Sequence, residues 1–323
     1  MRVPVSDIKD AATRALIGAG AEPWIAEAVA TAVAHAEAHG NVICGLYYLE
    51  SYCLQLHSGR VKGDVTPVVT QPRPGAVLVD AGFGFAQPAF QRGLPTALET
   101  ARAQGIALFS VTRAHTCTSL GYFTEQIAEA GLIGMGFTNA TAIVAPPGGA
   151  GRVLGTNPFA VSVPGADGHA LHYDSSTSAV ALGKITMAKA AGQSIPEGWA
   201  VDAEGRPTTN PAAALEGSLV SAAGYKGWGL GLLVEIMAGA LTGASLSRDV
   251  AGLKLPDGAP HNLGQTYILT APDVFSANFA AQIAELAATT EAAGGRLPGA
   301  QRAPMTEVEV PDALWTLTQK LAA

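Results

Sequence analysis

Residues 76–111 read AVLVDAGFGFAQPAFQRGLPTALETARAQGIALFSV, and this stretch decides the fold class. Two short apolar runs, 76–80 and 106–111, flank a segment, 88–104, that has the spacing of a helix. A strand, a helix and a second strand in this order are typical of an α/β protein. The turn Gly82-Phe-Gly84-Phe-Ala-Gln87 lies where a dinucleotide-binding glycine loop would lie, but Gln87 replaces the third glycine. We therefore interpret it as a plain tight turn.

Helical patterns precede this stretch, and mixed patterns follow it. Helices are expected at 6–18, 23–39, 46–57, 121–130, 225–241, 274–294 and 311–321. Strands are expected at 133–137, 142–145, 159–163 and 267–270, and residues 60–76 form a linker or an edge strand.

The composition excludes several classes of protein. Of the 323 residues, 48% are hydrophobic and 14% are charged, which predicts a folded chain. The net charge of −7 disfavours nucleic acid and anionic membranes as partners. Residues 227–244 are apolar but contain Glu235, so we expect a buried helix there and no membrane span. With no secretory signal and an odd number of cysteines (Cys44, Cys53 and Cys117), a reducing, cytoplasmic location is expected.

Several short motifs could bind ligands. His35 and His39 share one helix face, but the sequence shows no third metal ligand, so we expect an ordinary polar helix end and no metal site. The hydroxyl-rich run 174–178 follows an expected strand and could present donors to phosphate. Lys226 stands at a helix start, where it suits an anion, and Thr156 lies in a turn that could bind a polar ligand. Each motif alone is also compatible with an ordinary turn or a solvated side chain.

Taken together, the motifs resemble those of the malate/L-lactate dehydrogenase family that does not use a Rossmann fold. The resemblance rests on these blocks, whose order holds over about residues 5–320: Asp80…Gly84…Gln87, Leu154-Gly-Thr-Asn-Pro158, Ile195-Pro-Glu-Gly-Trp-Ala200, Asp202-Ala-Glu-Gly-Arg-Pro-Thr-Thr209, Gly224-Tyr-Lys-Gly227, Asn262-Leu-Gly264 and Leu297-Pro-Gly299…Arg302. The block Cys117-Thr-Ser-Leu-Gly-Tyr122 most resembles the branch of cyclic imino acid (piperideine- and pyrroline-2-carboxylate) reductases.

This resemblance implies an α/β fold with a mainly antiparallel central sheet and a helical N-terminal segment. Residues 1–75 would pack with the C-terminal end, residues 76–300 would bind cofactor and substrate, and residues 301–323 would return to the N-terminal segment. The chain would form a homodimer, and NADH or NADPH would deliver hydride to a C=N or C=O carbon beside a carboxylate. No nucleic-acid or membrane partner is expected.

The resemblance also implies a set of site residues. The cofactor-binding residues would be Asn139, Thr156, Asp174, Ser175, Ser176, Thr177, Ser178, Lys184, Tyr225, Lys226 and Gly299. The substrate would contact Tyr48, Arg113 and Cys117, and the catalytic positions would be Cys44, Asp174, Thr116 and His115.

The family's catalytic block departs most from the expected pattern here. Its Asp-Ser-His-Gly aligns with Val42-Ile-Cys-Gly45, so Cys44 replaces the proton-donating histidine and Tyr48 replaces a basic residue. Cys44 could be an acid or an inert thiol, and Asp174 could be its partner or a structural cap. Because a protonated imine already carries its proton, an imine substrate is favoured over a 2-oxo acid. Two alternatives stay open: a repurposed relative that uses Cys44 for isomerisation or dehydration, or a non-catalytic binding protein.

Overall fold

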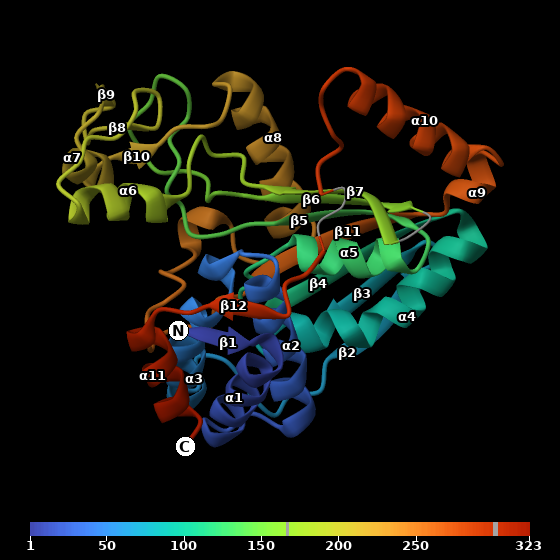
Figure 1. Cartoon of the computed structure of the whole chain (residues 1–323), viewed down its shortest axis with the longest axis horizontal. Helices are drawn as coiled ribbons and strands as arrows, with labels where there is room; N and C mark the ends of the chain where they lie inside the picture. The colour runs from blue at the N-terminus through green and yellow to red at the C-terminus, as the bar shows by residue number, and fades with distance from the viewer. Residues whose placement is uncertain (166–167, 300–302) are drawn as a thin grey trace.

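A seven-stranded sheet crosses the middle of the molecule (Figure 1); the computed structural model describes residues 1–165, 168–299 and 303–323. In spatial order the strands are β2 (Val68–Arg73), β3 (Ala76–Asp80), β4 (Ile106–Ala114), β11 (Leu263–Thr270), β5 (Ile133–Thr138), β6 (Phe159–Gly165) and β7 (Gly168–Ser175). Within it, β3 and β4 pair in parallel and the other neighbours pair antiparallel. This confirms the expectation of an α/β protein with a mainly antiparallel sheet.

The parallel pair is the opening stretch of sequence, in which α4 (Ala86–Gln104) connects β3 to β4. The turn before α4 is filled by neighbouring protein atoms. Lys62 N donates a hydrogen bond to Phe83 O at 3.0 Å, and a Cβ on Gly84 would lie 2.5 Å from a methyl group of Val65. The turn therefore has no room for a phosphate group.

An aromatic cluster fixes the helices that cover one face of the sheet. Phe90 of α4 and Phe123 of α5 (Gly121–Glu129) pack on Phe109 and Tyr267 of the sheet, with ring centroids 4.9–5.8 Å apart. All four rings are completely buried, so this contact anchors α5, whose first residues lie beside the end of β7.

The two ends of the chain meet in a helical layer below the sheet in Figure 1. Strand β1 (Arg2–Pro4) pairs with β12 (Glu307–Glu309), and their neighbours are α1 (Val5–Gly18), α2 (Pro23–Ala38), α3 (Leu49–Ser58) and α11 (Asp312–Leu321). The expected boundary at residues 300 and 301, and Arg302 of the late block, lie outside the described residues.

A third group of elements has its own small core, built on Leu154, Ile185 and Leu219. It contains the three-stranded sheet β10-β8-β9 and these elements: α6 (Leu182–Ala190), β8 (Ala200–Val201), β9 (Pro207–Thr208), α7 (Pro211–Glu216), β10 (Ser218–Leu219) and α8 (Tyr225–Glu235). Two further helices, α9 (Pro272–Phe275) and α10 (Phe279–Ala292), lie on the sheet face opposite α4 and α5 (Figure 1).

Three expectations about local structure were wrong. The helix expected at 46–57 begins with a 3₁₀ turn, Leu46–Tyr48, and becomes α-helical only at Leu49; another 3₁₀ turn, Val42–Cys44, precedes it. The strand expected at 142–145 is reduced to bridges at Val144, because its neighbours Leu154 and Leu219 belong to different elements. The helix expected at 274–294 is broken into α9 and α10, with Ser276 extended between them.

The apolar helix near residue 235 is not buried as expected. After α8 the chain continues as one π turn, Ile236–Ala240. Its buried side holds Glu235, which accepts a hydrogen bond from Asn157 Nδ2 at 2.7 Å, whereas Leu233 and Ile236 are exposed. One side of the helix packs on the protein and the other faces outward, so apolarity alone overestimated its burial. No described helix combines the length and the apolarity that a membrane span requires.

Candidate active site

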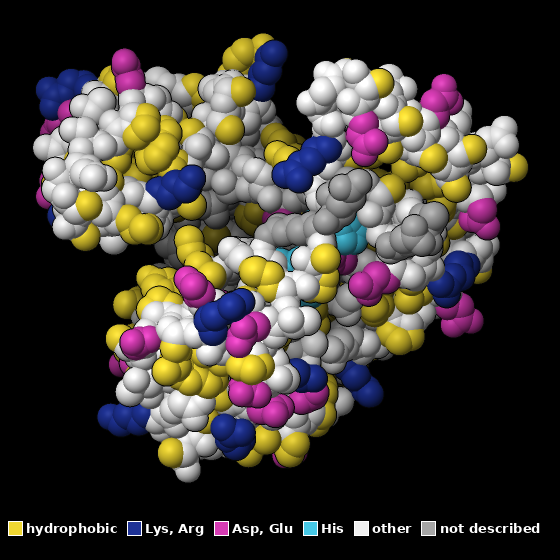
Figure 2. All heavy atoms as spheres, viewed as in Figure 1, with side chains coloured by type: hydrophobic (Ala, Val, Ile, Leu, Met, Phe, Trp, Pro, Cys, Tyr) yellow, Lys and Arg dark blue, Asp and Glu magenta, His cyan; other side chains and the backbone are white. Residues whose placement is uncertain are grey.

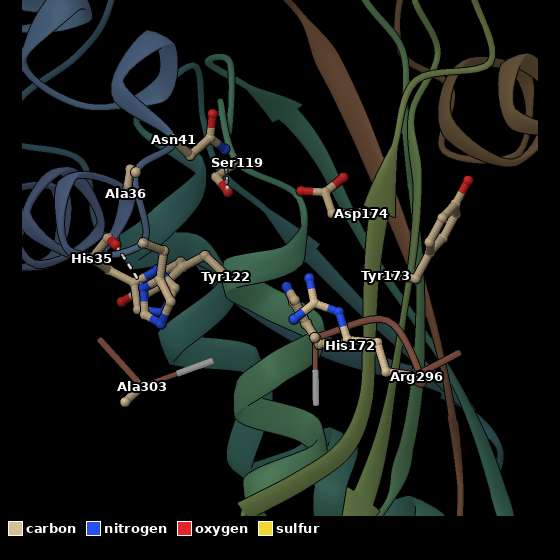
Figure 3. Close-up of a pocket in the computed structure, with 13 residues that line it drawn as sticks. His35, Ala36, Asn41, Ser119, Tyr122, His172, Tyr173, Asp174, Arg296 and Ala303 are labelled. Carbon is tan, nitrogen blue, oxygen red and sulfur yellow. Dashed lines mark hydrogen bonds between the residues drawn. The ribbon is translucent and has the colours of Figure 1, made fainter. Parts of the chain in front are cut away.

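A cavity of about 900 Å³ opens where α2, α5 and the end of β7 meet. Figure 2 shows this face of the molecule hollowed at its middle, with histidine side chains visible there. The lining residues are His35, Ala36, His39, Gly40, Asn41, Ser119, Tyr122, His172, Tyr173, Asp174, Arg296, Gly299 and Ala303 (Figure 3). A volume in this range accommodates a substrate together with part of a cofactor.

Asp174 is the one carboxylate among these lining residues. It lies near the end of β7, and its Oδ2 accepts a hydrogen bond from Gly121 N at 2.7 Å. Burial among protein atoms raises the pKa of Asp174 to about 6, although that hydrogen bond acts in the opposite direction. The side chain nevertheless faces the cavity and is exposed there, so the carboxyl exchanges its proton directly with water. Asp174 can thus change its charge near neutral pH.

His172 and Arg296 flank Asp174 in the cavity wall (Figure 3). His172 Nδ1 lies 2.8 Å from Ser162 Oγ, and burial lowers the pKa of His172 to about 4. His172 is therefore neutral at physiological pH and offers no positive charge to a substrate. Arg296, which comes from the segment after α10, supplies that charge at the exposed rim.

Cys44, Tyr48 and Cys117 form a neutral group behind the cavity lining. Burial raises the pKa of Cys44 to about 12, with a smaller contribution from the nearby charge of Asp174. Burial also raises the pKa of Tyr48 and of Cys117. Cys44 is near enough to Asp174, Tyr48 and Cys117 for their charges to interact, so the structure brings these four candidates together. At neutral pH, Cys44 is a thiol and a poor acid or base.

His115 and Thr116 lie apart from the residues that line the cavity. His115 is buried and stacks on His261 with ring centroids 3.9 Å apart, and its Nε2 lies 2.7 Å from Gln55 Oε1. Burial holds the pKa of His115 well below its usual range. The backbone N–H of Thr116 donates to His261 Nδ1 at 3.2 Å. This environment suits packing rather than proton transfer at neutral pH.

Arg113 is also placed away from Asp174. It forms a bidentate pair with Asp80, with Nε 2.8 Å from Oδ1, and its guanidinium lies over the ring of Phe83. The hydrogen bond to Asp80 raises the pKa of Arg113, which stays charged and engaged at the end of β4.

The hydroxyl-rich loop after β7 is fixed at its centre. Thr177 Oγ1 donates to the backbone oxygens of Thr156 and Asn157 at 3.1 Å, which ties the loop to the turn before β6. The hydroxyl groups of Ser175, Ser176 and Ser178 bond to atoms within the same loop.

Two of the predicted cofactor-binding residues, Asn139 and Gly299, have unusual surroundings. Asn139 donates from Nδ2 to Ser245 O at 2.8 Å, while its buried Oδ1 has no hydrogen-bond partner among the described residues. Gly299 has φ +74°, and a Cβ there would lie 2.6 Å from His172 Cβ. A backbone that approaches the cavity this closely requires glycine.

Lys184, Tyr225 and Lys226 lie on the third group of elements, outside the cavity lining. Lys184 is exposed on α6, and Tyr225 and Lys226 open α8, where 73% of the Tyr225 side chain is exposed. None of the three has a protein contact that would prevent it from turning to a ligand, as far as the described residues show.

The sequence did not single out several lining residues: His172, Arg296, Asn41, Ser119 and Tyr122. Arg296 directly precedes the recognised Leu297-Pro-Gly299 block, and Ser119 and Tyr122 lie inside the recognised 117–122 block. Extending those blocks by a residue, and treating each of their polar side chains as a candidate, would have found them. Nothing in the local sequence pointed to His172.

Comparisons with known proteins agree with this architecture. A profile of the malate/L-lactate dehydrogenase family matches residues 3–309. The chain is 36% identical to a Delta(1)-pyrroline-2-carboxylate reductase of Ancylobacter novellus, over 99% of this chain and 97% of that protein. It is 37% identical to a (2R)-3-sulfolactate dehydrogenase (NADP(+)) of Chromohalobacter salexigens, over 93% of this chain and 90% of that protein.

A solved structure shows the same fold along the whole chain. The crystal structure of delta1-piperideine-2-carboxylate reductase from Pseudomonas syringae matches with a TM-score of 0.92 and 31% identity, covering 99% of both chains. The match of the family profile and the identity to these relatives together show that this chain belongs to the malate/L-lactate dehydrogenase family.

Proposed function

We propose that this NAD(P)-dependent oxidoreductase reduces a small cyclic imine that carries a carboxylate on the carbon of its C=N bond. The observation that supports this most directly is the charge of the cavity wall. Asp174 is its one carboxylate, and burial leaves the neighbouring Cys44 and His172 uncharged at neutral pH. A single carboxylate in the cavity wall favours a cationic iminium over a neutral ketone of the same size.

The chain's own residues would divide the work as follows. The bound nicotinamide supplies the hydride. Asp174, as the anion, holds the N–H⁺ of the iminium and keeps the C=N bond polarised while hydride arrives. Arg296 at the rim pairs with the substrate carboxylate or with a cofactor phosphate. The backbone N–H of Gly121 fixes Asp174 in position, at 2.7 Å from Oδ2.

The cofactor would lie along the end of β7. We infer that the 174–178 loop and Asn139 contact the nicotinamide half, where Oδ1 of Asn139 accepts from its amide. Thr156 would hold that loop in place through the hydrogen bond from Thr177 to its backbone oxygen. Lys184, Tyr225 and Lys226 would turn towards the phosphates, and Gly299 would let the chain close over the ligand. The choice between NADH and NADPH is part of the test below.

A 2-oxo acid is the second candidate substrate, because one relative is a sulfolactate dehydrogenase. A ketone needs a proton during reduction, and Asp174, with a pKa of about 6, could give one only at lower pH. A role for Cys44 as the base of an isomerase or dehydratase is disfavoured, because burial raises the pKa of this thiol to about 12.

We also propose that the protein is a cytoplasmic homodimer. The outward side of α8 and its π turn exposes Leu233 (46%), Ile236 (56%) and Leu241 (51%). Apolar side chains this exposed along a single helix favour cover by a second copy. The molar mass in solution tests this proposal, and a monomer at all concentrations would refute it.

A substrate panel tests the proposed activity. Purified protein is mixed with NADH or NADPH and with Δ1-pyrroline-2-carboxylate, Δ1-piperideine-2-carboxylate, pyruvate or 3-sulfopyruvate, and the loss of the reduced nicotinamide absorbance is recorded. We expect the cyclic imines to be reduced fastest. If the cofactor binds but no substrate is turned over, the proposed dinucleotide site would stand and the proposed reductase activity would be contradicted.

A further inference from the structure

The geometry points to a site for a divalent transition metal, with Zn²⁺ the best fit, formed by His35 and His39 at the wall of the cavity and by Glu125 in an adjoining hollow. One ligand atom from each of the three side chains lies within 4.8 Å of the others. The helix pair His35 and His39 suggested only a polar helix end in the sequence, because Glu125 is about ninety positions away and comes from a different helix.

The two histidines are placed as metal ligands usually are. They are four residues apart at the end of α2, and their ring centroids are 4.1 Å apart. Nδ1 of His39 lies 2.9 Å from the backbone oxygen of His35. Because a carbonyl can only accept, the hydrogen must be on Nδ1, and the lone pair of the neutral ring is then on Nε2.

Glu125 brings a carboxylate between helix and sheet. Its Oε2 lies 2.7 Å from His35 Nε2, and its Oε1 lies 3.4 Å from His169 Nδ1 on β7. Two of the three proposed ligand side chains, Glu125 and His35, thus already face each other at one point.

Unsatisfied atoms at the same place form an independent observation. Glu125 is only 7% exposed, and its Oε2, apart from the ion-pair contact with His35, has no hydrogen-bond partner among the described residues. His35 Nδ1 is also buried without a hydrogen-bond partner among the described residues. Buried polar atoms rarely lack a partner. A cation between the imidazole rings and the carboxylate would provide one for Oε2.

The ligand chemistry selects the metal. Two imidazoles and one carboxylate suit Zn²⁺, which they bind at about 2.0–2.2 Å, better than Mg²⁺, which prefers an all-oxygen shell. Three protein ligands leave the remaining coordination position of a tetrahedral zinc to water. Both His35 and His39 also line the large cavity and an adjoining hollow of about 630 Å³, so the metal would be reached from solvent.

Metal binding is measured on the whole chain without any assay of turnover, so its outcome is independent of the proposed reductase activity. The protein is stripped with a chelator and dialysed near neutral pH against Zn²⁺, and bound metal is counted by elemental analysis. We expect about one zinc per chain, a higher melting temperature with Zn²⁺ and no such change with Mg²⁺.

Variants decide whether these side chains are the ligands. Glu125→Gln and His39→Gln should each weaken zinc binding at least tenfold, whereas His57→Gln, which changes an exposed histidine on α3, should not. Thermal melting in the presence of chelator shows which variants are folded. If Glu125→Gln does not fold, the zinc affinity of His39→Gln alone decides whether these side chains bind the metal. The proposal would be overturned if the wild type bound less than one zinc per chain, or if His57→Gln lost as much zinc affinity as the other variants. Glu125 and His35 would then form only an ordinary ion pair.

Discussion

The two sides of the cavity carry different chemistry, although both are built from polar side chains. On the β7 side, Asp174 is reached by water, and it keeps a pKa of about 6, close to neutral. On the opposite side, Cys117 is buried and Cys44 is partly exposed, and burial raises the pKa values of both thiols far above neutrality. Burial raises the pKa of all three groups, but a carboxyl that starts near about 4 is brought close to neutrality, whereas a thiol that starts near about 8.5 is carried further from it.

Replacing Asp174 should have the largest effect. Asp174→Asn keeps the shape of the side chain but removes the negative charge that would hold an iminium. We expect kcat/KM for the best cyclic imine to fall about 10²–10³-fold. Steady-state kinetics measures this, with Asp174→Glu as the variant that retains the charge. Equal activity of Asp174→Asn and wild type would show that the β7 side has no special role.

Gly299→Ala should have the next largest effect, through the cofactor. A Cβ at this position would lie 2.6 Å from His172 Cβ, so the backbone at residue 299 or at His172 must shift, and both residues line the cavity. We expect the KM for the nicotinamide cofactor to rise about tenfold, equivalent to about 1.4 kcal/mol.

Gly294→Ala is the matched control for that change. Gly294 also has a positive φ, +83°, but a Cβ there would contact nothing within 4 Å. Both variants therefore carry the same backbone strain, and only one clashes. If they raise the KM equally, strain alone explains the effect and the close approach at Gly299 is unimportant.

Asp174→Asn should stabilise the fold at neutral pH although it lowers the activity. Its folded pKa is raised, so the stability that this group contributes is present below the unfolded pKa of about 4 and is lost as pH rises through about 6. At pH 7, Asp174→Asn should thus be more stable than wild type, by about 1 kcal/mol after allowance for water in the cavity. Urea unfolding measures this gain, which should vanish near pH 4. A loss of stability at pH 7 would contradict the desolvation of Asp174.

Cys44→Ala should have the smallest effect on catalysis. The thiol is neutral at working pH because burial raises its pKa to about 12, so it neither accepts nor readily releases a proton. We expect kcat/KM to change by less than about threefold, a bound that follows from ordinary loss of packing. A large loss, accompanied by a changed alkaline limb of the pH profile, would restore Cys44 as a reacting group.

The sequence predicted the fold class well, because it depends on local patterns. The alternation at 76–111 and the family blocks were enough to predict the α/β fold and its mainly antiparallel sheet. The errors came where neighbours from distant parts of the chain decide local structure. Apolarity suggested a buried α8, but Leu233 and Ile236 face outward because only one side of the helix has a packing partner in this chain.

The candidate site was harder to predict, because burial and pairing are not visible in the sequence. His115 and Arg113 are polar residues near a strand end, yet one is enclosed by His261 and Gln55 and the other is engaged by Asp80. Conversely, His35 and Glu125 meet only because α2 and α5 pack together. The roles of the predicted site residues stay predictions until they are tested.

The pH dependence of kcat/KM tests the central claim most directly, namely that the anion of Asp174 stabilises a cationic substrate. With a cyclic imine, the wild type should lose activity as pH falls through about 6, where Asp174 takes up a proton. In Asp174→Asn this acid limb should be missing, and the remaining kcat/KM should be low and independent of pH over the same range. An acid limb that persists unchanged in Asp174→Asn, or a wild-type rate that increases below pH 6, would contradict the account.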